Sequence, residues 1–146
     1  MSLDLSICRI IEPAGQELRG MYRVLWELFP YDRPVYDDLL ATGEPFYNLR
    51  NFAVFLDDEF VGNAGLIWLK LWQNQKVTDI IGVGAVATVP KYRRQGAANC
   101  LMKHCMEIID SQRLPSSLYT ELAAVYQPHG FRVVQQQYPA ADISAV

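Results

Sequence analysis

Residues 86–99 read VATVPKYRRQGAAN, and this stretch joins a strand pattern to a helix pattern through a basic turn. The β-prone residues up to Val89 predict the end of a strand, and Pro90 stops it. A turn at the start of a helix exposes consecutive N–H groups at the positive end of the helix dipole, and Gly96 has no Cβ to keep a ligand away. The segment can therefore bind an anion such as a diphosphate. A solvated helix start explains the same residues equally well.

Strand and helix patterns continue on both sides of this segment. Downstream, apolar residues at helical spacing predict a helix over residues 97–109. Upstream, β-prone runs at residues 52–56, 60–71 and 77–89 alternate with polar turns, which predicts three consecutive antiparallel strands. The third run is rich in glycine and alanine. Small residues weaken a strand, but they let a ligand approach its backbone closely.

The remaining elements are shorter. We expect a strand over residues 5–11, an amphipathic helix over residues 18–29 and a second helix over residues 35–40. Near the C-terminus we expect a strand over residues 117–120, a short helix over residues 122–126 and a last strand over residues 131–136. This order predicts an α/β (α+β) sandwich with helices on both faces of a mixed sheet, and one domain over residues 1–146. The chain stops soon after its last expected element, which leaves a truncated C-terminus open.

Composition narrows the class of partner. The 146 residues are 51% hydrophobic and 20% charged, which is typical of a compact globular protein, and the net charge of -3 argues against nucleic acid. We see neither an apolar run long enough for a bilayer nor a signal peptide, so we expect no membrane partner and a cytoplasmic location. Three cysteines without a Cys-x-x-Cys pair favour neither disulfides nor zinc. Cys100 and His104 would be helix neighbours, but ordinary packing explains them, and we expect no metal.

The basic turn carries a family resemblance. It fits neither G-x-x-x-x-G-K-[ST] nor G-x-G-x-x-G, so ATP and dinucleotides are poor candidates. Residues 90–98, PKYRRQGAA, resemble the Q/R-x-x-G-x-G/A signature of the GNAT superfamily of N-acetyltransferases, with Arg93, Gly96 and Ala98 in its defined places. Residues 125–131, VYQPHGF, resemble the Leu-Tyr-x-x-x-Gly-Phe segment that closes such domains. The Val-Ala-Thr at residues 86–88 is most similar to the enhanced-intracellular-survival subgroup. The superfamily resemblance is good over residues 51–134.

The resemblance implies a GNAT-type mixed, mostly antiparallel sheet, with acyl-CoA between two parallel strands that splay apart. The cosubstrate would be acetyl-CoA. Main-chain groups of Val86, Ala87 and Thr88 would contact the pantetheine and acyl group. The diphosphate would rest on the turn and helix start, formed by Arg93, Arg94, Gln95, Gly96, Ala97, Ala98 and Asn99.

The implied activity is transfer of an acetyl group from acetyl-CoA to a primary amine by direct attack in a ternary complex. A strand N–H at Ala87 or a neighbour would stabilise the oxyanion, and Tyr126 stands where many family members place a tyrosine general acid. A core aromatic is the alternative role for Tyr126. The glutamate that histone-type members carry on the central strand falls on Gly82 here. Asp79, Glu121 or a water chain remain as the base.

The acceptor is left open by the sequence: a small amine, an antibiotic, a peptide N-terminus and a protein lysine all fit. Tyr31, Phe46 and Tyr47 are the best candidates to line an acceptor pocket because they lie in an irregular, aromatic corner of the chain, although core packing explains most of its aromatic residues. Dimers are common in the family, so a homodimer also stays open. Because Gly82 replaces a carboxylate, the rival interpretation is a non-catalytic acyl-CoA-binding or sensing domain.

Overall fold

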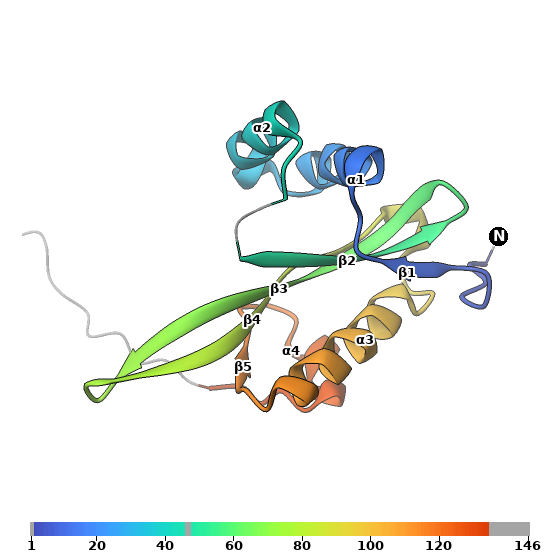
Figure 1. Cartoon of the computed structure of the whole chain (residues 1–146). Coiled ribbons are helices and arrows are strands. Elements are labelled where there is room, and N and C mark those ends of the chain that lie inside the picture. Colours follow the sequence, from blue (N-terminus) through green and yellow to red (C-terminus); the bar gives the residue numbers. More distant parts are fainter. Residues whose placement is uncertain (1, 46–47, 135–146) are drawn as a thin grey trace, which may run out of the picture.

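The computed structural model describes residues 2–45 and 48–134, and its centre is a five-stranded sheet (Figure 1). The strands lie in chain order: β1 (Arg9–Ile11), β2 (Leu49–Leu56), β3 (Glu59–Gln73), β4 (Lys76–Thr88) and β5 (Ser116–Ser117). The first four pair antiparallel, whereas β4 and β5 pair parallel. The mixed, mostly antiparallel sheet predicted from the sequence is confirmed.

Helices cover both faces of this sheet, as expected. On one face lie α1 (Gly15–Leu28), the 3-10 turn η1 (Pro30–Asp32) and α2 (Arg33–Thr42). On the other face lies α3 (Ala97–Gln112), which follows the turn η2 (Pro90–Tyr92) (Figure 1). The last elements are α4 (Ala123–Tyr126) and η3 (Gln127–His129). The second helix is longer than expected, from Arg33 to Thr42. It is capped by Gly43, whose left-handed φ of 69° lets its N–H donate to Leu39 O at 2.8 Å.

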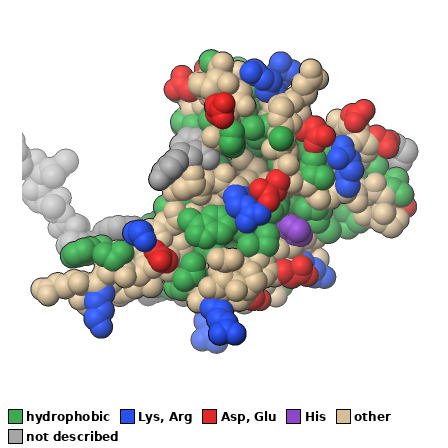
Figure 2. Space-filling view, in the orientation of Figure 1, with side chains coloured by type: hydrophobic (Ala, Val, Ile, Leu, Met, Phe, Trp, Pro, Cys, Tyr) green, Lys and Arg blue, Asp and Glu red, His purple; other side chains and the backbone are tan. Residues whose placement is uncertain are grey.

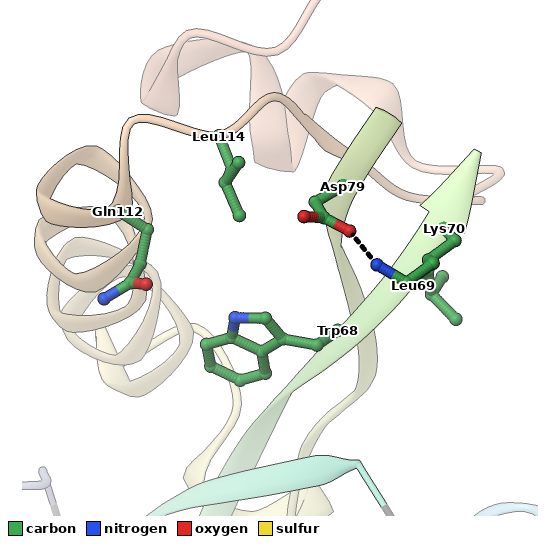
Figure 3. Close-up of a pocket in the computed structure, with 6 residues that line it drawn as sticks. All are labelled: Trp68, Leu69, Lys70, Asp79, Gln112 and Leu114. Atoms are coloured by element: carbon green, nitrogen blue, oxygen red, sulfur yellow. Dashed lines mark hydrogen bonds and ion pairs between the residues drawn. The ribbon is translucent and has the colours of Figure 1, made fainter. Parts of the chain in front are cut away.

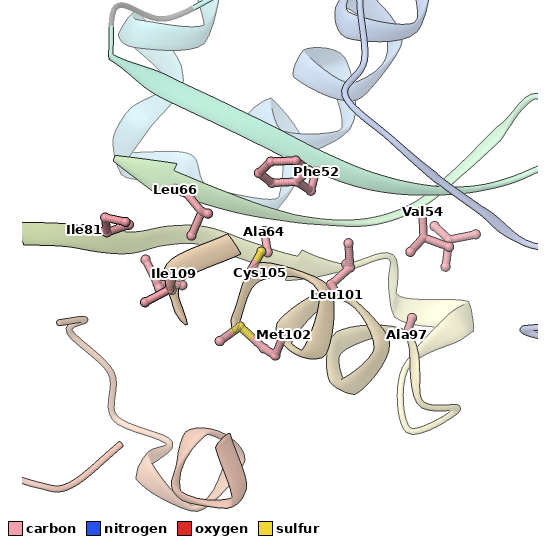
Figure 4. Close-up of a cluster of buried hydrophobic side chains, with 12 residues drawn as sticks. Phe52, Val54, Ala64, Leu66, Ile81, Ala97, Leu101, Met102, Cys105 and Ile109 are labelled. Atoms are coloured by element: carbon pink, nitrogen blue, oxygen red, sulfur yellow. The ribbon is translucent and has the colours of Figure 1, made fainter. Parts of the chain in front are cut away.

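The alternation of side chains along β2 explains its continuous apolar run. Phe52 and Val54 belong to the core beneath α3, and Ala53 and Phe55 belong to the core beneath α1. Because successive strand residues point to opposite faces and helices cover both, residues 52–55 are all buried. Figure 4 shows the α3 core, in which Leu101 is fully buried against the sheet. Burial of one such leucine stabilises the fold by about 1.5–3 kcal/mol.

Three expected strands differ from the structure. The strand over residues 5–11 is reduced to β1, because Asp4 instead forms a turn in which its carboxylate accepts the Ser6 hydroxyl at 2.6 Å. The strand over residues 117–120 is reduced to the two residues of β5. The last strand was wrong for residues 131–134, which form none: Val133 and Val134 are largely exposed and pair with no other strand within the described residues. Residues 135 and 136 lie outside the described part.

The hairpin of β3 and β4 extends beyond the helices (Figure 1). Apolar side chains such as Trp72 and Val77 are exposed on it, and Figure 2 shows hydrophobic surface at this end of the molecule. Acidic and basic side chains are interspersed on the face that Figure 2 shows, without a broad basic patch. Within residues 2–45 and 48–134, no helix is long and apolar enough to cross a membrane, and no cluster of His, Cys, Asp and Glu could hold a metal ion.

Candidate active site

A bulge in β4 lies at the centre of the candidate site. Gly84 pairs with Gly65 and Ala87 pairs with Asn63, so two β4 residues lie opposite one β3 residue. Ala85, inside the bulge, has a left-handed φ of 50°, a conformation that costs a residue with a Cβ about 1–2 kcal/mol. The buried Asn63 amide offsets this cost, because its Nδ2 donates to Ala85 O at 3.1 Å. Asn63 therefore fixes the bulge.

Asn63 was missed in the sequence, although an asparagine inside an apolar strand is a recognisable signal. Its Nδ2 also donates to Asn51 Oδ1 at 3.1 Å, which joins β2, β3 and β4 through two buried amides. Its own Oδ1 is buried and has no hydrogen-bond partner among the described residues. The two hydrogen bonds from Nδ2 hold the main chain of β4 against β3 and β2.

Beyond the bulge, one edge of β4 is open. The pairing with β5 covers only Ile81 and Gly82, after which no strand of the described chain pairs with β4 on that side. The carbonyl of Ala87 faces β3, since it would lie 2.8 Å from a Cβ added at Gly62. Main-chain groups alternate in direction along a strand, so those of Val86 and Thr88 face the open edge. The neighbours of Ala87, and not Ala87 itself, therefore direct their main-chain groups to the open edge, where the Thr88 carbonyl is bonded by the Arg93 side chain.

The turn after β4 gathers unbonded N–H groups. Arg94 and Gly96 both have left-handed φ angles, 61° and 90°, and α3 starts at Ala97 without a side-chain cap. The first helical bond runs from Cys100 N to Gly96 O at 3.0 Å. Across residues 2–45 and 48–134, no acceptor is bonded to the N–H groups of residues 94–99. This row of N–H groups at a helix N-terminus is suited to an anion.

The basic side chains of the turn differ in their partners. Lys91 forms an ion pair with Glu59, and hydrogen bonds from Lys91 and Tyr92 lower the pKa of the Glu59 carboxyl. The Arg93 Nε donates to Thr88 O at 3.1 Å, which fixes its guanidinium at the open edge of β4. The Arg94 guanidinium bonds to no other described residue and is exposed. Of these three side chains, Arg94 is thus the one with neither an ion pair nor a hydrogen bond to the described residues.

The N-terminal segment supports the turn from behind. Leu3 N–H donates to Gln95 Oε1, and Gln95 Nε2 donates to Lys91 O at 3.1 Å. Leu5 would lie 3.1 Å from a Cβ added at Gly96. The Gln95 side chain therefore shapes the turn, and the main-chain N–H of Gln95 is left for a ligand. A glycine is needed at position 96 both because of its left-handed φ and because Leu5 packs close to it.

The family follows from a match over most of the chain. The model of the acetyltransferase (GNAT) domain matches residues 9–134. The chain belongs to this GNAT family. Acyl transfer is the general chemistry of the family, and neither the family model nor the neighbouring structures support the narrower enhanced-intracellular-survival subgroup. No curated protein matches the chain.

Solved structures share the GNAT fold at low identity. The aminoglycoside N-acetyltransferase AAC(6')-Iy, solved with CoA, is 17% identical with a TM-score of 0.73 over 93% of this chain and 95% of that one. A predicted acetyltransferase of Clostridium acetobutylicum, solved with acetyl-CoA, is 10% identical with a TM-score of 0.68 over 92% and 96%. A probable N-acyltransferase of Enterococcus faecalis is 17% identical with a TM-score of 0.69 over 84% of this chain, which spans only 32% of that protein.

Tyr126 lies at the end of α4 in this GNAT domain. Its ring is half-buried against the α3 core and meets Phe131 edge to face, with centroids 6.3 Å apart. Burial raises the pKa of its hydroxyl, and that hydroxyl bonds to no other described residue. Gly130, with a left-handed φ of 96°, turns the chain so that Phe131 reaches this contact. His129 packs nearby, and its pKa is lowered by burial and by Lys103.

The carboxylates expected as bases have no hydrogen bond or ion pair to the bulge among the described residues. Asp79 forms an ion pair with Lys70 at 2.5 Å, beside a cavity of about 380 Å³ that Trp68 and the end of α3 also line (Figure 3). Glu121 is exposed. A Cβ added at Gly82 would lie 3.2 Å from Leu69 Cδ1, so the exposed end of that leucine would have to shift by a few tenths of an ångström to admit the glutamate of histone-type members.

A second cavity, of about 340 Å³, reaches the bulge from the other face of the sheet. Its walls come from α1, η1, α2, β2, β3 and β4, and Ala85 and Asn51 form part of it. Of the residues expected to line an acceptor pocket, Tyr31 is 99% exposed and lies outside its lining, while Phe46 and Tyr47 lie outside the described residues. Asp32, next to Tyr31, does line the cavity and was missed.

Proposed function

We propose that this chain, as a single domain over residues 1–146, transfers an acetyl group from acetyl-CoA to a primary amine by direct attack. The observation that carries the proposal is the continuity between the open edge of β4 and the unbonded N–H groups of residues 94–99. A pantetheine arm needs main-chain partners along a strand, and a diphosphate needs N–H groups at a helix start. One chain segment supplies both in sequence.

In this proposal the diphosphate accepts hydrogen bonds from the N–H groups of residues 94–99. Arg94 adds an unpaired positive charge, and Arg93 adds the guanidinium N–H groups that Thr88 leaves free. Ala97 acts through its main chain, because its side chain is buried in the α3 core. The pantetheine bonds the main chain of Val86 and Thr88, while Ala87 packs from within the sheet.

The amine nitrogen attacks the thioester carbon, and the C–S bond then breaks to release the CoA thiolate. The Val86 N–H, held beside the bulge by Asn63, stabilises the oxyanion that forms. Tyr126 donates its proton to the thiolate. Since burial raises the pKa of Tyr126, its hydroxyl is protonated at neutral pH and can donate to the departing thiolate. Because a thiol with a pKa of about 8.5 is a stronger acid than this phenol, the phenolate that forms takes up a proton from water, which restores the hydroxyl.

The attacking amine must also lose a proton. Asp79 is engaged by Lys70, and Glu121 is exposed, so neither is positioned by the described contacts to take it. We infer that water in the cavity above Ala85 carries this proton away. Asp32 is the carboxylate in the described lining of that cavity.

The second candidate is a non-catalytic acyl-CoA-binding domain, which the glycine at position 82 favours. Calorimetric titration with acetyl-CoA, followed by thiol release with a panel of primary amines, separates the two. We expect binding and amine-dependent release. Binding with no release beyond hydrolysis for any amine would favour the binding domain, and absence of binding would refute both.

A further inference from the structure

The cavity that reaches the bulge from the α1–α2 face has a lining suited to one class of acceptor. Its volume of about 340 Å³ is near the lower end of the roughly 300–1,000 Å³ of small-molecule sites. Leu25, Leu39, Leu49 and Ile67 give it an apolar wall. Ala85 places one end of this space directly at the bulge of β4. An acceptor inside it would touch mostly hydrocarbon on its way to the acyl group.

The charge of this cavity is small and of one sign. Asp32 is the only carboxylic acid in its described lining, which contains no Lys, Arg or His. Burial, with smaller effects of the Asp32 charge and of Tyr22, raises the pKa of Tyr36 to about 12. The Tyr36 phenol is therefore neutral at physiological pH.

A polar end faces the bulge. Asn51 is 6% exposed and lines the cavity, and its Oδ1 is already bonded by Asn63 Nδ2. Its Nδ2 bonds to no other described residue, so the end of the cavity beside Ala85 offers one donor next to an apolar wall. A single polar group of an acceptor can be satisfied there. Outside the reach of Asn51, Asp32 and the two tyrosines of the lining, further polar or charged groups would meet the apolar wall and lose water without gaining partners.

We propose that the acceptor is a compact primary amine with an apolar body and a single positive charge, such as an alkylamine or arylalkylamine. This proposal rests on the proposed acetyltransferase function. Asp32, exposed at the cavity, attracts the ammonium as the acceptor enters. In the bound acceptor the apolar body packs between α1, α2 and the sheet, and the amino group reaches Ala85. A polycation such as an aminoglycoside would place additional charges against leucine and isoleucine, which costs affinity. We therefore expect this cavity to prefer an acceptor with one charge over an aminoglycoside.

The test compares acetyl-CoA-dependent thiol release for phenylethylamine, hexylamine, hexamethylenediamine, kanamycin and a lysine-containing peptide. We expect kcat/KM for the two monoamines to exceed that for kanamycin and the peptide by about tenfold or more, a difference that two or three buried methylenes can supply. The diamine should fall below hexylamine, because its second charge enters the apolar wall. If kanamycin or the peptide is the best substrate, the inference is wrong while the acetyltransferase function stands. If acetyl-CoA binds and no amine is acetylated, the proposed function itself fails.

A pair of surface variants tests the location. Val35 is 42% exposed and lines the cavity, whereas Val77 is 52% exposed on the distant hairpin. Val35→Lys should raise KM for phenylethylamine about tenfold by placing a cation on the path of an ammonium, with acetyl-CoA affinity unchanged. Val77→Lys should change neither. An unchanged KM in Val35→Lys, with folding verified by circular dichroism, would place the acceptor elsewhere.

Discussion

The two faces of the sheet contribute to the site by different means. On the α3 face, the contribution comes from the main chain, because residues 94–99 present unbonded N–H groups. Of their side chains, that of Gln95 shapes the turn and that of Ala97 packs in the core. On the α1–α2 face, side chains of six separate elements enclose the second cavity. In the function that we propose, the main chain recognises the acetyl-CoA and the side chains of the second cavity select the acceptor.

The largest effect should come from Tyr126→Phe, which keeps the contact with Phe131 and removes only the hydroxyl. We expect kcat to fall about a hundredfold, with the Kd of acetyl-CoA unchanged, because a general acid typically contributes about 10²–10⁴-fold. Steady-state kinetics and calorimetry measure the two quantities. A fall in affinity with kcat retained would mean that Tyr126 is a packing residue.

The pH profile sharpens the same point. Burial raises the pKa of Tyr126, and a general acid must be protonated to act. The kcat of the wild-type protein should therefore stay constant as the pH rises above neutrality, and should fall only once the pH exceeds the ordinary tyrosine pKa of about 10. A basic limb already falling near pH ~8.5 would assign the proton to another group.

Asn63→Ala should have the next largest effect, since it frees the bulge without touching any ligand. We expect kcat to fall about tenfold or more, because a displaced oxyanion donor costs about 10²–10³-fold when lost entirely. Unfolding in denaturant should show a cost of about 1–3 kcal/mol for the groups left unpaired.

A matched control removes a similar amide bond away from the bulge. Asn48 Nδ2 donates to Trp68 O at 2.9 Å. Glycine is the replacement because it adopts the left-handed φ of 55° at this position without strain. Asn48→Gly should leave kcat near the wild-type value. Equal losses of kcat in both variants would mean that Asn63 acts through stability alone.

Arg94→Glu tests how much the side-chain charge of the turn adds to acetyl-CoA binding beyond its main-chain N–H groups. Reversal of the unpaired cation should raise the Kd of acetyl-CoA about tenfold, or about 1.4 kcal/mol, while kcat changes little. Arg23, also exposed and free of ion pairs in the described chain, provides the control: Arg23→Glu should leave the Kd unchanged. An equal rise of the Kd in both variants would mean that the net charge of the protein, and not the position of Arg94, determines the affinity.

A pair of glycines gives the smallest expected change. Gly96→Ala should lower the free energy of unfolding by about 1–2 kcal/mol, because alanine is strained at a φ of 90° and its Cβ approaches Leu5. Gly20→Ala, inside α1 with open space around it, should raise it by about 0.5–1 kcal/mol. Denaturant midpoints measure both. A stabilised Gly96→Ala would contradict the turn geometry.

The sequence predicted what local patterns determine. The turn at residues 93–98 was recognisable because its glycine, basic residues and following helix are adjacent in the chain, and β2 to β4 were clear from their apolar runs. Asp32 and Asn51 could not be assigned to one cavity, since they belong to separate elements that only the tertiary fold brings together. The partners of Lys91 and Arg93 were likewise hidden, as was the direction of Ala87, which depends on the register between β3 and β4.

Amide hydrogen exchange with and without CoA tests the central claim most directly. If main-chain N–H groups bind the cosubstrate, CoA should slow exchange at residues 94–99 and at Val86 and Thr88, and leave α1 and α2 unchanged. Protection confined to the α1–α2 face, or unchanged exchange at residues 94–99 in the presence of saturating CoA, would contradict the account.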